Sequence, residues 1–476
     1  MKRTSLALSV LLALPASVLA GAPKYVFLFI GDGMSTPQRM VTEEFARKCG
    51  LGDLAMNHLP YQSNTRTISA DAIITDSAAS GTAIACGKKT KNGMLGVDPA
   101  KKRVSSVAEV AKRRGMKVGI VTTVTIVHAT PAAFYSHLAN RGRFYRIALD
   151  LVGSGFDYFA GGGVYDKFDD RKDPDYRGNV FDLARKAGYA VTIDDRAAWA
   201  ALRPGGKSWS VFGHFGMNFA IDADGSEPTL AELLAKGVEL LDGPQGFFMM
   251  CEGGKVDYAC HANDAATNIR DILALDDAVK AALAFQERHP DETLVVTTGD
   301  HETGGLSMGF AGIGGKFRVE MLANQKVSTE SFSSAIKKRI RERLARDGGD
   351  LTIEEVKPML REAFGFVFPG DGGAAAGGIE LRDGEVRQLR AALAKDVSFV
   401  RAKRRDTTAH DVARIYVFAQ TAKNVLNARA GVGWSSGSHT ALPTFTTAKG
   451  PGADILVGMD DNADIGLRMK RLLETP

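Results

Sequence analysis

Cysteine is scarce in this sequence, and the cysteines present do not have the spacing of a thiolate zinc site. The 476 residues include four, Cys49, Cys86, Cys251 and Cys260. No Cys-x-x-Cys pair occurs, which excludes the usual zinc-thiolate motif. Four cysteines allow three complete disulfide pairings, and the sequence does not choose among them. Cys251 lies in an apolar run, so a buried free thiol is as compatible with its surroundings as a disulfide.

A long hydrophobic run and a strong charge imbalance are also missing. No stretch reaches the ~20 apolar residues that a membrane-spanning helix needs. The net charge of +5 is too small to indicate nucleic-acid binding, and the basic clusters at 101–103 and 403–405 are typical of solvated surfaces. The sequence therefore predicts a globular protein with no membrane insertion and no specific nucleic-acid ligand.

Residues 1–20 differ from the rest of the chain. Lys2 and Arg3 precede a short apolar run, Leu6–Leu14, and Ala20 ends a tripeptide with small residues where a signal peptidase reads. This pattern predicts a cleavable signal peptide rather than a membrane anchor, because the apolar run is too short to span a bilayer. We therefore expect an exported protein, either periplasmic or secreted.

Five short apolar runs, each bounded by glycine or polar residues, have the character of strands buried on both faces. They are Tyr25–Ile30, Lys117–Thr122, Tyr158–Ala160, Phe247–Cys251 and Leu294–Thr297. Helical patterns lie between them, for example at 105–114 and 268–288. This alternation predicts an α/β fold with a mostly parallel sheet and helices on both faces.

Polar side chains follow four of these five runs. Asp32 follows the first run, Thr130 the second, Glu252 the fourth, and the pair Asp300 and His301 the fifth. Ligands of open α/β sheets bind at the carboxyl ends of the strands. We therefore expect these segments, which are distant in sequence, to meet in one site.

The sequence changes character between residues 309 and 405, where charged helical stretches at 328–345, 352–364 and 384–394 replace the strand pattern. We interpret 309–405 as an insertion that forms a crown, a lid or a dimer contact. A catalytic domain would then comprise 21–308 and 406–476. The glycine-rich tract at 369–378 is expected to be a flexible loop, since it has neither P-loop nor G-x-G-x-x-G spacing.

Metal-ligand candidates fall into two chemical classes. Asp32, Thr130 and Glu252 offer only oxygen, which suits Mg²⁺. A second set mixes carboxylates with imidazoles, which suits Zn²⁺; its members are Asp257, His261, Asp300, His301 and His439. Asp257 and His261 stand four apart and would project from one helix face, although such pairs are common on surface helices. Ligand type thus allows three metal ions.

Ser77, in the segment "ITDSAASGT", is the candidate nucleophile. No histidine lies near it in sequence, so we expect a divalent metal, rather than a histidine base, to lower the pKa of its hydroxyl. The small residues at 78–81 would open a helix whose N-terminus attracts an anion, and Arg141 could grip a tetrahedral oxyanion with two hydrogen bonds. A rival Gly-x-Ser-x-Gly elbow at Gly433–Gly437 is disfavoured, because a helix precedes it where a strand is required.

Six segments, "FIGDGM", "TDSAASGTA", "ATPAAFYSHLANR", "CEGGKVDYACH", "TTGDHETGG" and "GWSSGSHT", resemble in this order the motifs of the alkaline phosphatases. The resemblance implies a three-layer sandwich and a phosphomonoesterase that is usually homodimeric. It makes Ser77 the phosphorylated nucleophile and Arg141 the phosphoryl-binding residue. It also implies two zinc ions and one magnesium ion per subunit. The ligands would be Asp257, His261 and His439 for the first zinc, Asp32, Asp300, His301 and Ser77 for the second, and Asp32, Thr130 and Glu252 for magnesium.

Members of the family differ at the positions of His128 and Tyr258, so occupancy of the magnesium site stays open. A phosphodiesterase or a sulfatase of the same superfamily is the nearest alternative. Sulfatases need a Cys or Ser followed by Pro and Arg, which "SAASG" lacks, and diesterases generally use threonine and lack the glutamate-containing third site. A secreted protein that binds metal or phosphate without turnover is a further alternative, disfavoured by the presence of Ser77.

Overall fold

The computed structural model describes residues 22–311, 313, 315–371, 378–402, 415–458 and 461–474. The predicted signal peptide at 1–20 lies outside the described residues, as does most of the glycine-rich tract. No helix in the described part of the chain has both the length and the hydropathy to cross a bilayer. All four cysteines are described and all are free thiols, with Cys86, Cys251 and Cys260 buried.

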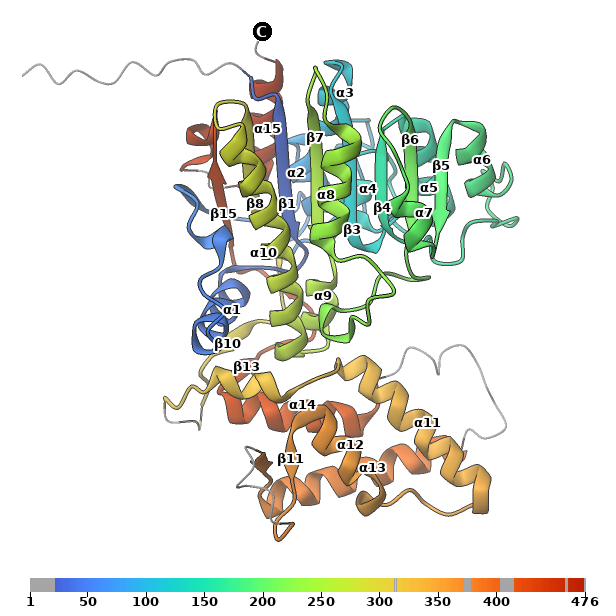
Figure 1. Ribbon diagram of the computed structural model, residues 1–476, viewed down its shortest axis with the longest axis vertical. Helices are drawn as coiled ribbons and strands as arrows, with labels where there is room; N and C mark the ends of the chain where they lie inside the picture. The colour runs from blue at the N-terminus through green and yellow to red at the C-terminus, as the bar shows by residue number, and fades with distance from the viewer. Residues whose placement is uncertain are drawn as a thin grey trace, which may run out of the picture.

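A nine-stranded sheet forms the centre of the molecule (Figure 1), in the order β2-β15-β8-β1-β7-β3-β4-β6-β5. Seven neighbouring strands are parallel: β8 (Thr293–Gly299), β1 (Tyr25–Gly31), β7 (Phe247–Gly253), β3 (Lys117–Thr125), β4 (Tyr158–Gly162), β6 (Lys207–Val211) and β5 (Tyr189–Ile193). β15 (Thr444–Lys449) is antiparallel to both β8 and β2 (Tyr61–Thr65). All five predicted strands are present and adjacent, so the prediction of a mostly parallel sheet is confirmed. The search for apolar runs missed β2, β5, β6 and β15, whose sequences are more polar.

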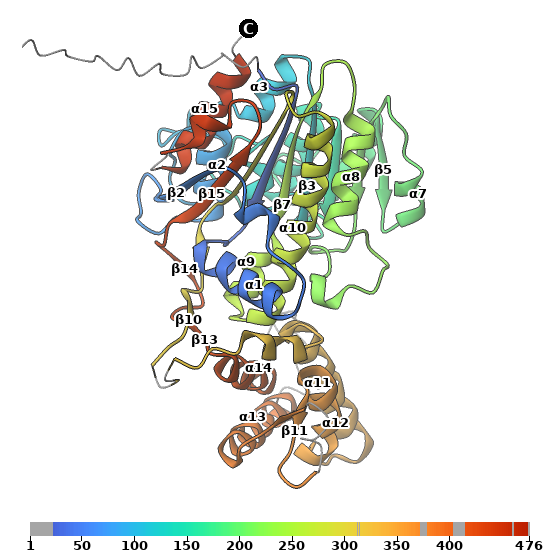
Figure 2. The same ribbon diagram turned by 60° about the vertical axis from the view of Figure 1, so that its left-hand side comes forward.

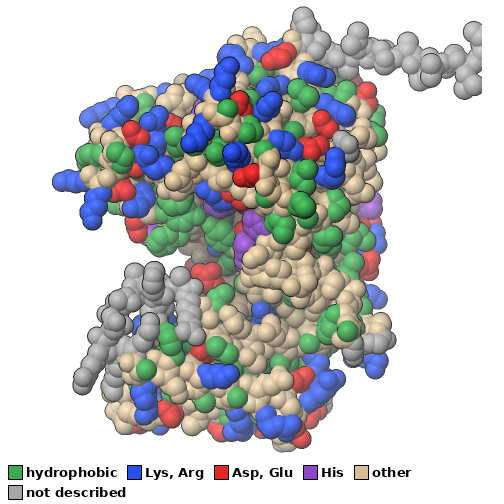
Figure 3. Space-filling view, turned by 180° about the vertical axis from the view of Figure 1, so that it is seen from behind, with side chains coloured by type: hydrophobic (Ala, Val, Ile, Leu, Met, Phe, Trp, Pro, Cys, Tyr) green, Lys and Arg blue, Asp and Glu red, His purple; other side chains and the backbone are tan. Residues whose placement is uncertain are grey.

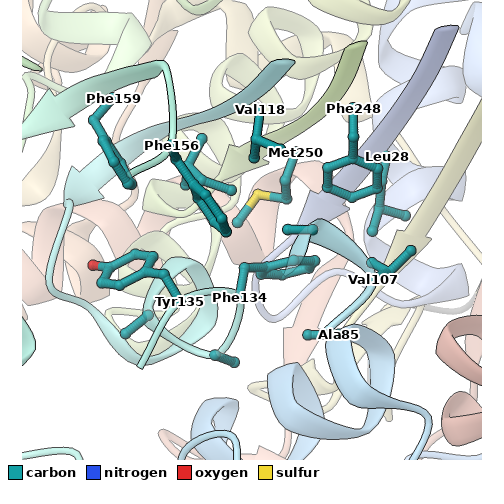
Figure 4. Packing of buried hydrophobic residues seen from close by; sticks show 14 of the residues in the cluster. Leu28, Ala85, Val107, Val118, Phe134, Tyr135, Phe156, Phe159, Phe248 and Met250 are labelled. Carbon is teal, nitrogen blue, oxygen red and sulfur yellow. The ribbon is translucent and has the colours of Figure 1, made fainter. Parts of the chain in front are cut away.

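Alternate residues of the central strands supply two separate cores, one on each face of the sheet. Leu28, Phe248 and Met250 pack with residues of α2 (Ser77–Cys86) and α3 (Val107–Arg113) on one face (Figure 4). Phe27 and Met249 pack on the other face with α8 (Leu230–Leu241) and α10 (Ala265–Arg288). Strand side chains alternate between faces, so strands that are apolar throughout need cover on both sides. The predicted three-layer arrangement is confirmed.

A separate group of helices, which we call the helical body, lies below the carboxyl ends of the strands (Figures 1 and 2). It consists of α11 (Thr329–Asp347), α12 (Ile353–Phe364), α13 (Asp383–Ala402) and α14 (Val417–Ala430). Its core includes Phe332, Leu360, Leu393 and Leu426. Helix α14 thus packs with the helices of 309–405 although it follows them in the sequence. Figure 3 shows that the surface is hollowed between the two parts of the molecule.

The remaining elements cover the sheet or connect its strands. The helices are α1 (Thr36–Lys48), α4 (Ala129–Ala132), α5 (Phe144–Ser154), α6 (Val180–Lys186), α7 (Arg196–Ala200), α9 (Lys255–His261) and α15 (Asn462–Glu474). Short strand pairs join β9 (Glu302–Thr303) to β14 (His439–Thr440), β10 (Leu306–Met308) to β13 (Val432–Trp434), and β11 (Phe366–Val367) to β12 (Ile379–Glu380).

Helix α15 supports α2, the helix that begins at Ser77, through a backbone contact that only glycine allows. A Cβ atom at Gly466 would lie 2.6 Å from the Gly87 nitrogen at the end of α2, and closer still to the Ile84 carbonyl oxygen. We expect Gly466→Ala to lower the free energy of unfolding by about 1–3 kcal/mol, because backbone atoms cannot yield as a flexible side chain would. Urea denaturation of the purified protein measures this change.

Gly153 in α5 is the matched control, since a Cβ atom there would meet no atom of the described residues within 4 Å. Gly153→Ala should leave stability unchanged or raise it by up to ~1 kcal/mol, because alanine favours the helix. Equal effects of the two substitutions would contradict the proposed contact.

Candidate metal centre and nucleophile

Four buried carboxylates gather at the carboxyl edge of the central sheet. Asp32 directly follows β1, Glu252 is the penultimate residue of β7, Asp300 directly follows β8, and Asp257 lies in the first turn of α9. Strand β1 pairs with both neighbours, so that Ile30 stands opposite Glu252 on one side and Thr298 on the other. The parallel register therefore brings together three acids that are far apart in the sequence.

Gly33 lets the loop after β1 approach these acids closely. Its φ is +71°, and a Cβ atom there would lie 2.8 Å from Asp257 Oδ1. Its backbone N–H donates a hydrogen bond of 3.0 Å to Asp300 Oδ1. Positive φ favours glycine, and here close packing requires it as well.

Ser77 is the first residue of α2 and reaches the acids from the other side. Asp76 caps this helix, its carboxylate accepting a hydrogen bond of 3.0 Å from the Ala79 N–H. The Ser77 Oγ atom lies 3.2 Å from His301 Nε2 and 3.5 Å from Asp32 Oδ1. The predicted helix start is therefore present, and a histidine that is remote in sequence is close to the serine in space.

Donor atoms of ligand type converge in three overlapping groups, each with its atoms within 4.8 Å of one another. The groups are Asp32, Asp300 and His301; Asp257, His301 and His439; and Asp32, His128 and Glu252. The first contains three of the four ligands predicted for the second zinc, and Ser77 lies beside it. Which ion each group would hold stays a prediction.

The other two groups differ in part from the predicted ligand sets. His261 Nε2 lies 3.3 Å from Asp257 Oδ2, but the donor group around Asp257 contains His301 and His439 rather than His261. The His301 and His439 rings stack with their centroids 3.7 Å apart. Thr130 Oγ1 lies 3.4 Å from both Asp32 Oδ2 and Asp300 Oδ2.

His128 joins Asp32 and Glu252, a role that sequence reasoning did not assign. Its Nδ1 lies 3.5 Å from Asp32 Oδ2. The one sequence feature that could have indicated this role is that His128 stands two residues before Thr130, a predicted ligand. Two supporting threonines were also missed. The Thr122 hydroxyl donates to Glu252 Oε2, and the Thr303 hydroxyl donates to Asp257 Oδ1 at 2.6 Å. A threonine has no sequence pattern that marks it as a support for a carboxylate.

The pKa values of these acids reflect crowding in a dry site. Burial, together with the charges of neighbouring carboxylates, raises the pKa of Glu252 to about 8 and that of Asp300 to about 7. The same causes raise the pKa of Asp32 well above its usual range. Glu252 Oε1 is buried and has no hydrogen-bond partner among the described residues. Buried carboxylates need a partner charge, so this donor set fits divalent cations.

Arg141 is the cation placed beside Ser77. Its Nη1 donates to Asp76 Oδ2 at 3.0 Å, and its Nη2 lies 3.1 Å from His128 Nε2. The guanidinium is partly exposed and adjoins the N-terminus of α2. Both the helix N-terminus and a planar guanidinium favour a bound oxyanion.

The rival Gly-x-Ser-x-Gly segment does not form a nucleophile elbow. The expectation that a helix directly precedes it was wrong, because the strand β13 lies between α14 and the serines. The short strand β14 follows, however, whereas an elbow needs a helix after the serine. The Ser435 hydroxyl donates to the Gly305 carbonyl at 3.3 Å. His439, just after this segment, opens β14 and faces the acids, with Nε2 3.8 Å from Asp257 Oδ1.

Known proteins are similar to this chain in both sequence and fold. The family model described as alkaline phosphatase matches residues 23–475. The chain belongs to the alkaline phosphatase family. Alkaline phosphatase 4 of Bacillus subtilis (strain 168) is 30% identical over 468 residues, which cover 94% of this chain and 88% of that protein. The solved cold-active alkaline phosphatase from Shewanella sp. superposes with a TM-score of 0.77 at 26% identity, covering 94% of this chain and 99% of that one.

A second solved relative, the Thermus thermophilus alkaline phosphatase, has a TM-score of 0.76 at 26% identity and covers 96% of this chain and 93% of that one. Membership of the family makes the protein a metal-dependent hydrolase of phosphate monoesters. The predicted fold, family and enzyme class are thus confirmed. The alternatives of a phosphodiesterase, a sulfatase and an inactive binding protein are not supported by these relatives.

Removing the metals should make stability fall as pH rises. A carboxyl with a raised folded pKa binds its proton more tightly in the folded protein, so its stabilising effect is lost as pH rises through the folded value. In the metal-free protein Asp300, with a pKa of about 7, and Glu252, with a pKa of about 8, contribute to this loss. His261, whose pKa is raised to about 9 by its hydrogen bond with Asp257, adds a loss of the same sign. Burial lowers the pKa of His128 to about 3. This group makes stability rise with pH, but only below its unfolded pKa of about 6.5. Thermal melting from about pH 6.5 to 9 with a chelator measures the trend.

Two controls make this measurement specific. The metal-loaded protein should show a flatter profile, because bound cations keep the carboxylates ionised. Glu252→Gln, which has no proton to lose, should reduce the slope of the metal-free profile. A metal-free melting temperature that rises over this interval would contradict the assignment.

Proposed function

We propose that Ser77 attacks the phosphorus of a phosphate monoester and carries the phosphoryl group as phosphoserine. The observation that carries this proposal is the position of Ser77 Oγ, 3.2 Å from His301 Nε2 and 3.5 Å from Asp32 Oδ1 at the N-terminus of α2. The Oγ–P bond forms as the P–O bond to the alcohol breaks. Water then attacks the phosphoserine, which returns the serine and releases inorganic phosphate.

The surrounding residues hold the phosphoryl group and shape its approach. Arg141, fixed by Asp76 at 3.0 Å, would bind two phosphoryl oxygens, and the free N–H groups of α2 would face the same anion. Asp76 both caps α2 and orients Arg141, so the nucleophile and the anion-binding group share one support. Divalent ions, when bound, would lower the pKa of the attacking hydroxyl and neutralise charge on the departing oxygen.

We propose two Zn²⁺ and one Mg²⁺ as the resident ions of each subunit. The groups containing imidazole and carboxylate suit zinc, whereas Asp32, Thr130 and Glu252 suit magnesium through their oxygens. His128 adds a nitrogen beside Glu252, so the third site is the one where the identity of the ion most needs measurement. Metal analysis of the purified protein tests the ratio, and three zinc ions with no magnesium would contradict it.

Three further properties belong to this proposal. An alkaline optimum is expected because the attacking hydroxyl must lose its proton, and a pH–rate profile with an acidic maximum would contradict it. Export is supported by the signal-peptide pattern at residues 1–20, and the N-terminal sequence of the mature protein would test it. Homodimer formation is supported by the family resemblance, and sedimentation of the purified protein as a monomer would contradict it.

Replacing the nucleophile tests the proposal directly. Ser77→Ala should lower kcat for an aryl phosphate by at least about a thousandfold, because no phosphoserine can form. Wild-type protein quenched in acid during turnover should carry one phosphoryl group on the peptide containing Ser77, and the variant none. Intact-mass and peptide-mass spectrometry would detect the label.

Ser435→Ala is the matched control, because Ser435 is the serine of the rejected esterase segment. It should retain wild-type turnover and phosphoserine labelling. Loss of activity in Ser435→Ala with survival in Ser77→Ala would reverse the assignment. Preference for a diester over the matching monoester would instead favour the phosphodiesterase alternative.

A further inference from the structure

Three aromatic side chains form a continuous surface that the reaction proposed above does not use. We call Phe144, Tyr165 and Phe215 the aromatic wall. The ring centroid of Tyr165 lies 4.5 Å from that of Phe144 and 6.1 Å from that of Phe215. Phe215 is 56% exposed, more than any other phenylalanine, tyrosine or tryptophan in the described residues. A single exposed apolar residue is ordinary, but here the exposed Phe215 continues into Tyr165 and Phe144, which are half-buried against the core. The three rings together offer one apolar surface, as a binding surface would.

The aromatic wall begins at the catalytic site. The Tyr165 hydroxyl lies 2.9 Å from the hydroxyl of Tyr258, the residue that follows Asp257. The Tyr258 ring meets His128 edge-on at 6.0 Å, and His128 contacts Arg141. Phe144 stands three residues after Arg141 on the same connection. The wall therefore extends outward from the group that would hold the phosphoryl oxygens.

Figure 3 shows hydrophobic side chains gathered beside the histidines on the underside of the sheet, where the surface is hollowed towards the helical body. Arg143 lies on the same connection as Phe144, but its Nη2 pairs with both Asp173 and Asp175 at 2.9 Å. This nearby cation is thus neutralised, which leaves apolar contact as the main interaction that the wall offers.

The loop that carries Phe215 is fixed to the sheet. The Met217 N–H donates to the Thr123 carbonyl at 2.9 Å, and Gly216 forms a bridge with Val124 at the end of β3. A Cβ atom at Gly162 would lie 2.5 Å from the Gly216 Cα atom, so the two segments are in backbone contact. The loop backbone around Phe215 is therefore held in place by the sheet, and the Phe215 ring is exposed on this fixed backbone.

The other side of the aromatic wall is held in an unfavourable backbone conformation. Tyr165 and Asp166 have φ values of +52° and +59°, which are uncommon for residues other than glycine. The Asp166 carboxylate contacts the ring of His214, the neighbour of Phe215. This contact links the two segments of the wall, and strained backbone of this kind often marks a functional site.

We propose that the aromatic wall binds the leaving alcohol, so that the enzyme favours phosphate monoesters of aromatic alcohols over those of small aliphatic alcohols. This inference rests on the proposed function, because Arg141 and Ser77 define where the phosphoryl group sits. An aromatic leaving group would extend from that position past Tyr258 and stack on Tyr165 and Phe215. A small aliphatic alcohol would offer the wall no aromatic ring to stack on.

Phe215→Ala tests the proposal in the metal-loaded, full-length enzyme. We expect kcat/KM for 1-naphthyl phosphate to fall about three- to tenfold, the range expected for loss of one aromatic contact. The value for glycerol phosphate should stay within about twofold of wild type. Binding is measured separately with phosphonates that cannot be hydrolysed: the inhibition constant of phenylphosphonate should rise, and that of methylphosphonate should stay the same.

Phe168→Ala is the matched control, since Phe168 is also an exposed aromatic but stacks on Phe181 at 6.1 Å instead of on Tyr165. It should change neither substrate's kcat/KM. Equal losses on both substrates in Phe215→Ala, or no loss on the aryl substrate, would overturn the proposal. Those outcomes leave the phosphoserine assignment intact, whereas absence of the Ser77 label would refute that assignment whatever the substrate preference.

Discussion

Repulsion among buried carboxylates is the constraint on which the rest of this structure depends. Asp32, Glu252, Asp257 and Asp300 are all nearly inaccessible to solvent, and burial with mutual charge raises the pKa values of three of them. Only Asp257 departs from this trend, because His261 beside it lowers its pKa. A protein would not retain such a cluster for stability alone, since each unpaired buried charge is costly. Divalent cations would neutralise the repulsion among these carboxylates, and this relief would make the binding of the cations favourable.

The scaffold meets this constraint with rigid parts. Parallel strands deliver Asp32, Glu252 and Asp300 in fixed register, and cores on both faces of the sheet hold the strands in place. Helix α2 points its N-terminus at the acids, and its cap Asp76 also holds Arg141. The same edge of the sheet therefore combines ligands for cations with a site for an anion. A metallohydrolase of phosphate monoesters needs this combination, because the substrate is an anion and the charge of the reacting group is neutralised by metals.

Two different structures flank the cluster of acids. The helical body lies below the carboxyl ends of the strands, and its core also takes in residues of α1 and α10. The aromatic wall lies to one side of the acids, supported by the ends of β3 and β4. The residues proposed to react thus lie at the edge of the sheet. The connections that follow the strands form the surface that a leaving group would contact, and such loops can vary without changing the sheet.

The sequence by itself determined the central strands, the residue types at their ends and the family. Runs such as Phe247–Cys251 are apolar throughout, and such strands need cover on both faces, so the parallel sheet followed from composition. Motif order then led to the prediction of Ser77 as nucleophile, of Arg141 as phosphoryl-binding residue and of the metal ligands. Polar strands such as β2 and β15 were not predictable in this way, because their pairing depends on neighbours that a local pattern does not contain.

Only the tertiary structure decided how the donor side chains share the site. His128 joins Asp32 and Glu252, and His301 stands between two groups of donors and beside Ser77. Thr122 and Thr303 orient carboxylates from remote segments, and α14 packs with helices that precede it. The aromatic wall likewise joins three segments with no common motif. These relations are distances between residues far apart in the chain, and they exist only once packing has fixed the backbone and selected one rotamer for each side chain.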